Sequence, residues 1–207
     1  YEALGCEVIP LYCDVDGNFP NHHADPTKKE NLTDIIKAVK KHKADVGIAF
    51  DGDVDRLGGC DEQGNMLVGD RLLALFSRNI LADKPGSTIL GEVKCSRGLY
   101  EDIEKHGGKA IMWRTGHSHI KAAMKELHAE LAGEMSGHIF FKHRWYGFDD
   151  AIYAGARLLE IVAGGDKPLS AHLATIPQRL STTEIEFHCP DSRKFEVIRQ
   201  MVAYFQK

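Results

Sequence analysis

Hydrophobic and polar positions along the chain follow two alternating patterns, one typical of strands and one typical of helices. Short runs rich in apolar and β-branched residues predict strands, and apolar residues recurring every three to four positions predict helices with one buried face. We expect strands at residues 7–11, 45–50, 57–60, 65–68, 88–93, 110–113, 138–141 and 183–188. We expect helices at residues 70–82, 96–106, 118–128, 149–162 and 195–204, and one capped by Asn31 or Thr33 with Ile35, Ile36 and Val39 on a shared face.

The order of these elements bears on the fold class. Strands that alternate with helices favour an α/β fold, with mixed but largely parallel sheets flanked by helices. The pattern is interrupted near residues 68–70 and again near 177. After 177, a strand followed by a helix suggests the start of another domain. We therefore expect repeated α/β domains divided at these two places.

Composition narrows the class of protein without identifying it. The chain has 207 residues, enough for one or two domains with a buried core. A hydrophobic share of 43% and a charged share of 27% are ordinary for a soluble globular protein. The net charge of -4 disfavours nucleic acid or an anionic membrane as the main partner, but it leaves room for a small anionic ligand.

Cysteine usage and the ends of the chain suggest a cytoplasmic protein that is a piece of a longer one. No two cysteines have C-x-x-C spacing, so we expect reduced thiols. No apolar run is long enough for a membrane span, and no basic stretch precedes an apolar one at the start. The chain opens without Met, as if within a domain. The cysteines are Cys6, Cys13, Cys60, Cys95 and Cys189.

The most informative segment is the acidic hexapeptide DGDVDR at residues 51–56, directly after an expected strand. Asp51, Asp53 and Asp55 repeat at every second position, so their side chains can converge on one centre. Two carboxylates 4 Å apart repel by about 1 kcal/mol in water and about 4 kcal/mol at an effective dielectric of 20. Convergence therefore calls for a cation, and oxygen ligands alone favour Mg²⁺ or Ca²⁺.

Two other interpretations of the acidic segment compete with a magnesium site. It can be a solvated acidic turn, or an EF-hand loop with Glu62 as its twelfth residue. The EF-hand needs Gly at the sixth position, which holds Arg56, and a preceding helix in place of a strand. Arg56 beside the carboxylates favours a phosphate ligand, because guanidinium binds phosphate bidentately, and the combination suits phosphoryl transfer.

A second motif, GEMSGH at residues 133–138, narrows the interpretation of the acidic segment to one protein family. Together they resemble the metal loop and the sugar loop of the α-D-phosphohexomutases, the phosphomannomutase/phosphoglucomutase family. The resemblance implies that Asp51, Asp53 and Asp55 hold Mg²⁺. The family commonly has Gly at the fourth position of the metal loop, where this chain has Val54; that position supplies no carboxylate, so we expect metal binding to survive.

The same resemblance gives roles to residues of the second loop and of two weaker segments. It implies that Glu134 and Ser136 hydrogen-bond sugar hydroxyls and that His138 transfers a proton or contacts phosphate. The segments at residues 93–97 and 114–118 each end a strand and open a helix, where anions bind well. By resemblance the first supplies Lys94 as a substrate contact and the second places His117 in the site, whereas Arg97 stays open between a ligand contact and a surface charge.

Two parts of the family pattern are missing from this chain. The family's phosphoserine lies on a Thr-Ala-Ser-His-Asn-Pro loop in the first domain, and no such loop is present. Ser118 followed by His119 lacks the Asn-Pro, and a helix N-cap is the favoured role for Ser118. We expect residues 1–68 to be the later part of domain 2, 69–177 to be domain 3, and 178–207 to begin domain 4, with domains 1 and 4 of the same polypeptide completing the site.

The resulting functional hypothesis concerns the longer protein. It interconverts hexose 1-phosphate and hexose 6-phosphate through a phosphoserine and a bisphosphate intermediate, with hexose 1,6-bisphosphate as activator and with Arg56 and His138 as catalytic groups. The alternatives are a non-catalytic module that binds sugar phosphate and Mg²⁺, and a phosphatase of the haloacid dehalogenase type, which leaves residues 134–138 unexplained. The choice among glucose, mannose and glucosamine phosphates stays open. Residues 145–150 can face the site, although buried aromatic packing is favoured for them.

Overall fold

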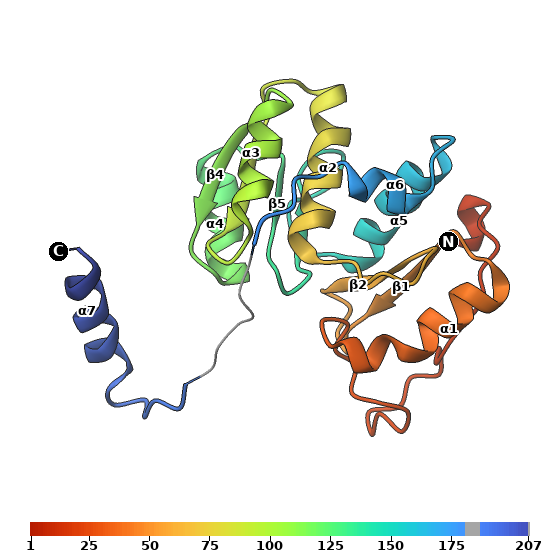
Figure 1. Cartoon of the computed structure of the whole chain (residues 1–207), viewed down its shortest axis with the longest axis horizontal. Helices are drawn as coiled ribbons and strands as arrows, with labels where there is room; N and C mark the ends of the chain where they lie inside the picture. Colours follow the sequence, from red (N-terminus) through yellow and green to blue (C-terminus); the bar gives the residue numbers. More distant parts are fainter. Residues whose placement is uncertain (181–186, 207) are drawn as a thin grey trace.

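The computed structural model describes residues 1–180 and 187–206 and contains two β-sheets (Figure 1). The smaller sheet is an antiparallel pair, β1 (Val46–Phe50) with β2 (Leu57–Asp61). The larger sheet has the strand order β4-β3-β5-β6. The expected α/β class is confirmed, since helices accompany both sheets and the larger sheet is largely parallel.

The larger sheet is built around its strand β3 (Thr88–Glu92). This strand pairs in parallel with β4 (Lys109–Trp113) on one side and with β5 (Leu131–Gly133) on the other. Strand β6 (Ile139–Phe141) folds back antiparallel on β5. The carboxyl ends of β3, β4 and β5 therefore meet along one edge of the sheet, which is where α/β folds place ligands.

Helices cover both faces of this sheet. Ile89 of β3 joins a core cluster with residues of α2 (Gly69–Asp83) and α3 (Arg97–Lys105), whereas Leu90 joins a second cluster with residues of α4 (His117–Glu126). Successive strand residues point to opposite faces, so one strand serves both clusters. The first cluster also takes residues from α5 (Ala151–Ala163) and α6 (Leu169–Ala174).

The smaller sheet carries its own helix, α1 (Thr33–His42), preceded by the short 3-10 turns η1 (Glu2–Leu4) and η2 (Lys29–Leu32). The face predicted for α1 packs on β1, since a Cβ on Gly47 would lie 2.9 Å from both Ile35 and Val39. Neither predicted cap of this helix forms: the N-cap is Leu32, and no side chain caps it.

Several expected elements differ in the structure. Residues 7–11 form no strand, because they are exposed and no described strand lies beside them to complete a ladder. Residues 65–68 contribute only one bridge, between Met66 and Cys60. Helix α6 was not among the expected helices. The strand expected at 183–188 falls mostly outside the described residues.

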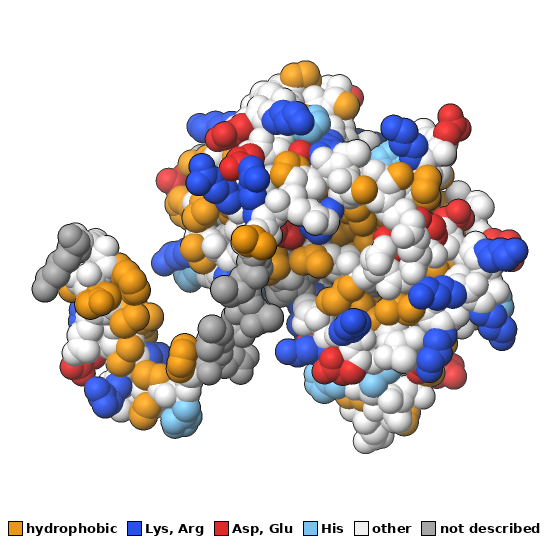
Figure 2. Space-filling model, viewed as in Figure 1, with side chains coloured by type: hydrophobic (Ala, Val, Ile, Leu, Met, Phe, Trp, Pro, Cys, Tyr) orange, Lys and Arg blue, Asp and Glu red, His pale blue; other side chains and the backbone are white. Residues whose placement is uncertain are grey.

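The last helix, α7 (Lys194–Phe205), confirms the helix expected at 195–204 and has no buried residue. Figure 2 shows hydrophobic side chains along this helix. Three of its apolar residues, Phe195, Ile198 and Met201, are each at least about half exposed. Among the helices that the structure describes, none combines the length and the apolar character that crossing a membrane requires.

Candidate functional site

The loops singled out from sequence follow the carboxyl ends of β1, β3, β4 and β5. The loop at residues 134–138 contacts the acidic loop, the loop after β4, and Glu92 at the end of β3. Arg56 and His138 form an isolated antiparallel bridge, and the Leu57 N–H donates to the Gly137 carbonyl at 3.0 Å. The acidic loop of the smaller sheet is thereby joined to the larger sheet. A Cβ on Gly137 would lie 2.6 Å from the Leu57 carbonyl oxygen, so this approach needs glycine.

The acidic loop brings its three carboxylates together, as predicted. Asp51, Asp53 and Asp55 can each place one oxygen within 4.8 Å of the others. Asp51 is buried, and its Oδ1 accepts from the backbone N–H groups of Asp55 at 3.1 Å and Arg56 at 3.0 Å. Strand β1 precedes the loop and β2 follows it, so an EF-hand, which needs helices there, is excluded.

The pKa values of these carboxyls are shifted in opposite directions. Burial raises the pKa of Asp51, but hydrogen bonds and the charge of Arg56 outweigh burial, and the net pKa is lowered. Burial also raises the pKa of Asp55; the charge of His138 opposes this, the charges of Asp51 and Asp53 add to it, and the net pKa is raised. Negative charge at Asp55 is therefore poorly compensated by the protein, as at a site that takes a cation.

Arg56 is held by two carboxylates. Its Nε donates to Asp51 Oδ2 at 2.6 Å, and its Nη1 lies 3.6 Å from Asp25 Oδ1. Asp25 was missed by sequence reasoning, because it lies in a polar loop with no motif. Its Oδ1 also accepts from the N–H and the hydroxyl of Thr27, which fixes it beside the guanidinium.

His138 lies between two carboxylates from different parts of the chain. Its Nδ1 is 3.3 Å from Asp149 Oδ2 and 3.6 Å from Asp55 Oδ2, and its ring stacks on His117 with centroids 5.8 Å apart. Asp149 also receives a hydrogen bond from Lys121 at 2.9 Å. Sequence reasoning missed Lys121, and it named Asp149 only as part of residues 145–150, for which packing was favoured over a place in the site.

The sugar-loop residues of the prediction lie in a tight turn between β5 and β6. Glu134 is 3% exposed, and its Oε1 accepts from the Gly116 N–H at 2.7 Å. Ser136 Oγ lies 3.4 Å from the second oxygen, Oε2, at the long limit of a hydrogen bond. This oxygen and the Ser136 hydroxyl therefore keep capacity to bind further groups.

Lys94 and Arg97 differ in their surroundings. Lys94 Nζ lies 3.9 Å from Glu92 Oε1, at the edge where the other loops meet. Arg97 is 85% exposed and pairs with Glu101 one helical turn on, which favours a surface charge. Ser118 is not an N-cap: α4 begins at His117, and its N-cap residue is Gly116.

The aromatic segment after β6 packs mainly on itself and on α5. Trp145 stacks on Tyr153 with centroids 4.3 Å apart, and its indole N–H donates to Asp150 Oδ2 at 3.1 Å. The preference for packing is thus confirmed for Trp145, while Tyr146 and Phe148 stay 74% and 42% exposed.

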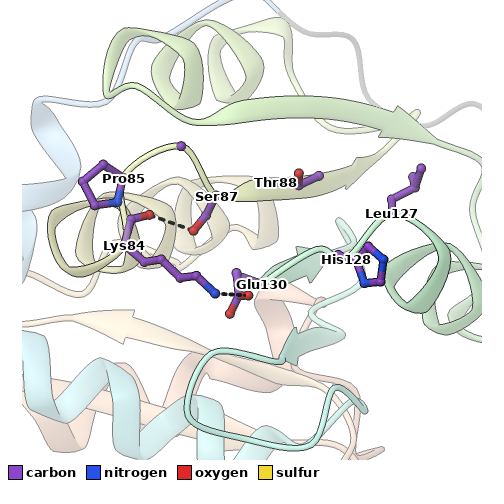
Figure 3. A pocket seen from close by; sticks show the side chains of 8 residues that line it. Lys84, Pro85, Ser87, Thr88, Leu127, His128 and Glu130 are labelled. Atoms are coloured by element: carbon purple, nitrogen blue, oxygen red, sulfur yellow. Dashed lines mark hydrogen bonds and ion pairs between the residues drawn. The ribbon is translucent and has the colours of Figure 1, made fainter.

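A shallow hollow at the opposite edge of the sheet holds none of the predicted residues (Figure 3). It lies at the amino ends of β3 and β5, where Lys84 forms an ion pair with Glu130 at 2.6 Å. The candidate site is therefore the cluster of loops at the carboxyl edge.

Comparison with known proteins agrees with both motifs. Residues 1–64 match the sequence model for phosphoglucomutase/phosphomannomutase alpha/beta/alpha domain II, and residues 68–180 match that for domain III. A phosphomannomutase/phosphoglucomutase of Pseudomonas putida is 55% identical over 95% of this chain, and a phosphoglucomutase of Neisseria gonorrhoeae is 52% identical over 98%. The chain spans 42% and 44% of the lengths of these relatives.

A solved structure has a similar fold. A family member from Burkholderia thailandensis, 52% identical, superposes with a TM-score of 0.84 over 87% of this chain and 39% of its own. Fold, motifs and relatives all agree, and the chain belongs to the phosphoglucomutase/phosphomannomutase family.

Proposed function

We propose that this chain supplies the metal-binding and sugar-binding parts of an enzyme that interconverts hexose 1-phosphate and hexose 6-phosphate. The observation that carries the proposal is the bridge between Arg56 and His138, which joins the acidic loop to the loop of Glu134 and Ser136. A phosphate-binding guanidinium, a proton-transfer group and sugar-binding groups then belong to one site. Relatives named phosphomannomutase/phosphoglucomutase support the same reaction.

The proposed metal ligands are Asp51, Asp53 and Asp55. Their fit to Mg²⁺ rests on an all-oxygen donor set gathered within 4.8 Å and on the raised pKa of Asp55. When bound, Mg²⁺ would draw negative charge from a phosphoryl oxygen. Arg56, held by Asp51 and Asp25, would hold the same phosphoryl group from a second side.

The other residues would bind and orient the sugar phosphate. Glu134 Oε2 and the Ser136 hydroxyl would hydrogen-bond sugar hydroxyls, and Lys94 and His117 would attract phosphate from neighbouring loops. His138, between Asp55 and Asp149, would give or take the proton of the reacting hydroxyl.

The phosphoserine would come from another domain of the longer protein. We propose the divisions 1–68, 69–177 and 178–207 for the parts of domains 2, 3 and 4 in this chain, with domains 1 and 4 completing the site. Hexose 1,6-bisphosphate would be the activating intermediate of that protein. On this proposal the chain binds hexose phosphate without turning it over.

Two measurements on the chain test the proposal. Calorimetry with Mg²⁺ present should give saturable binding of glucose 1-phosphate or mannose 1-phosphate. Glu134→Gln should weaken this binding. Glu104→Gln, which replaces an exposed carboxylate on α3, should leave it unchanged. A coupled mutase assay with a trace of hexose 1,6-bisphosphate should give no turnover. Turnover would mean that the phosphoryl carrier lies within these residues, and absence of binding would count against sugar recognition by this chain.

A further inference from the structure

Glu92 ends the central strand β3, and its side chain is fully buried at 0% exposure. Strand β3 pairs with β4 through Glu92 and Trp113, and with β5 through Gly91 and Gly133. The loops that leave β4 and β5 therefore pass on either side of the Glu92 side chain. A buried carboxyl group is costly unless its oxygens are hydrogen-bonded, so its partners matter.

The partners of Glu92 come one from each of these loops. Oε1 accepts from the Met135 N–H at 2.7 Å, and Oε2 accepts from the Thr115 hydroxyl. Glu134, next to Met135, accepts from the N–H of Gly116, next to Thr115, at 2.7 Å. The three hydrogen bonds close a circuit through Glu92, Thr115–Gly116 and Glu134–Met135, which we call the loop-linking ring.

Four of the groups proposed to contact the hexose phosphate lie in this ring or close to it. Glu134 is a member, Ser136 and His117 each follow a member directly, and Lys94 comes two residues after Glu92 with its Nζ 3.9 Å from Oε1. We infer that Glu92 is a positioning residue for hexose-phosphate recognition, which sets the relative placement of Glu134, Ser136 and His117. The inference rests on the proposed function and deepens it.

Glu92 is itself fixed at its backbone. Its carbonyl accepts from the Tyr100 hydroxyl at 2.7 Å, and a Cβ on Gly91 would lie 2.8 Å from that hydroxyl oxygen. Strand pairing, α3 and the two loops therefore constrain one residue from several directions. A forked carboxylate suits the position because its two oxygens can accept from two loops at once.

Four variants separate positioning from general stability. Glu92→Ala opens the ring, and Thr115→Val removes one link while keeping the side-chain volume. Glu92→Gln keeps an acceptor for Met135 and can donate to the Thr115 oxygen, so the ring persists without the charge. Asp102→Asn is the matched control: Asp102 is 1% exposed and pairs with Arg78 at 2.6 Å, away from the ring.

The test measures glucose 1-phosphate affinity by calorimetry with Mg²⁺ present, and amide hydrogen exchange of Met135 and Gly116 by NMR. We expect Glu92→Ala and Thr115→Val to speed exchange at both amides and to lower affinity by about tenfold and about threefold. Glu92→Gln should retain affinity within about threefold, and Asp102→Asn should leave both readouts unchanged.

Three outcomes would overturn the inference. One is faster exchange with unchanged affinity, since the ring would then be only structural. Another is equal loss in Glu92→Ala and Glu92→Gln, since charge beside Lys94 would then matter more than the ring. The third is unchanged exchange of both amides in Thr115→Val, since the ring would then not hold the two loops. This readout needs no ligand: if the unaltered chain binds no glucose 1-phosphate, the proposed function of the chain fails separately, and faster exchange in Thr115→Val still supports the ring.

Discussion

Arg56 and His138 face each other across an antiparallel bridge, although 82 positions separate them in the sequence numbering. Each also contacts Asp55, Arg56 through Nε at 4.0 Å and His138 through Nδ1 at 3.6 Å. The bridge therefore connects the two loops through backbone and side chains alike, and changes at this junction should affect both loops.

Gly137 provides the first prediction, because its φ of 96° and its contact with the Leu57 carbonyl exclude a Cβ. Gly137→Ala should lower the free energy of unfolding by about 2 kcal/mol or more and weaken glucose 1-phosphate binding. Gly147 is the matched control, since its φ is 87° but only the flexible Lys142 side chain is near. Gly147→Ala should cost about 1 kcal/mol and leave binding intact. Urea unfolding and calorimetry on both variants measure this, and equal effects would contradict it.

Removing Arg56 should lower the stability of the fold as well as weaken phosphate binding. Arg56→Ala leaves the buried Asp51 carboxylate without its Nε donor, although two backbone N–H groups remain. We expect a loss of about 2 kcal/mol in the free energy of unfolding. Arg97→Ala, which breaks an exposed ion pair, should cause no measurable loss. Chemical denaturation of the two variants tests this, and a stable Arg56→Ala chain would show that water replaces the guanidinium.

Val54 has a φ of 63°, which is unfavourable for a β-branched residue. Its carbonyl accepts from the Ala151 N–H and its N–H donates to the Asp51 carbonyl, so the loop is held in this conformation. Val54→Gly should therefore be more stable than Val54→Ala by about 1 kcal/mol. Val39, inside α1, supplies the control, where the order should reverse. Thermal unfolding of the four variants measures both orders, and the same order at both sites would argue against strain at Val54.

Asp55→Asn should have opposite effects on stability and on metal binding. The folded-state pKa of Asp55 is raised above its unfolded-state pKa. In the pH range between these two values the folded chain binds more protons than the unfolded chain, so stability falls as pH rises through that range. Above that range, in a chelator, the neutral Asn should raise the melting temperature. With Mg²⁺ the variant should bind more than about tenfold more weakly. Calorimetry and thermal scans with and without metal check the two signs; a lower melting temperature in chelator would contradict the first.

The contact between Glu62 and Ser170 should make stability depend on pH in the opposite sense. Burial raises the pKa of Glu62, but hydrogen bonds from the Ser170 hydroxyl and N–H outweigh it and lower the net value. The contribution is therefore present above the unfolded pKa of about 4.3 and is lost as pH falls through the lower folded-state pKa. The stability difference between the unaltered chain and Glu62→Gln should be largest near neutrality and shrink below about pH 4.

Unfolding curves from neutral to acid pH measure this difference. Glu104→Gln, an exposed carboxylate on α3, controls for general charge effects. A difference between the unaltered chain and Glu62→Gln that does not change with pH would mean that the contact with Ser170 does not stabilise the ionised carboxylate.

Local sequence patterns were enough to predict much of the fold and of the candidate site. Apolar periodicity located β1, α2, β3 and α5 within about two residues, because burial on one face follows directly from spacing. Within the acidic loop, and likewise within the turn at 134–138, the site residues are neighbours in sequence. Their convergence inside each segment therefore needed only a strand end and a short loop. Family membership followed from these two motifs.

Other features depended on partners far away in the chain. Residues 7–11 have strand-like composition, but a strand exists only where another strand can complete its hydrogen bonds. Three residues of the site belong to no motif, and each gained its role from a group that folding brought near. Asp25 lies beside Arg56, Asp149 lies beside His138, and Glu92 lies between two neighbouring loops. The sequence by itself determined the chemistry within each loop. Only the tertiary structure decided which loops meet, because contacts between distant residues depend on how strands pair and helices pack, which no local pattern records.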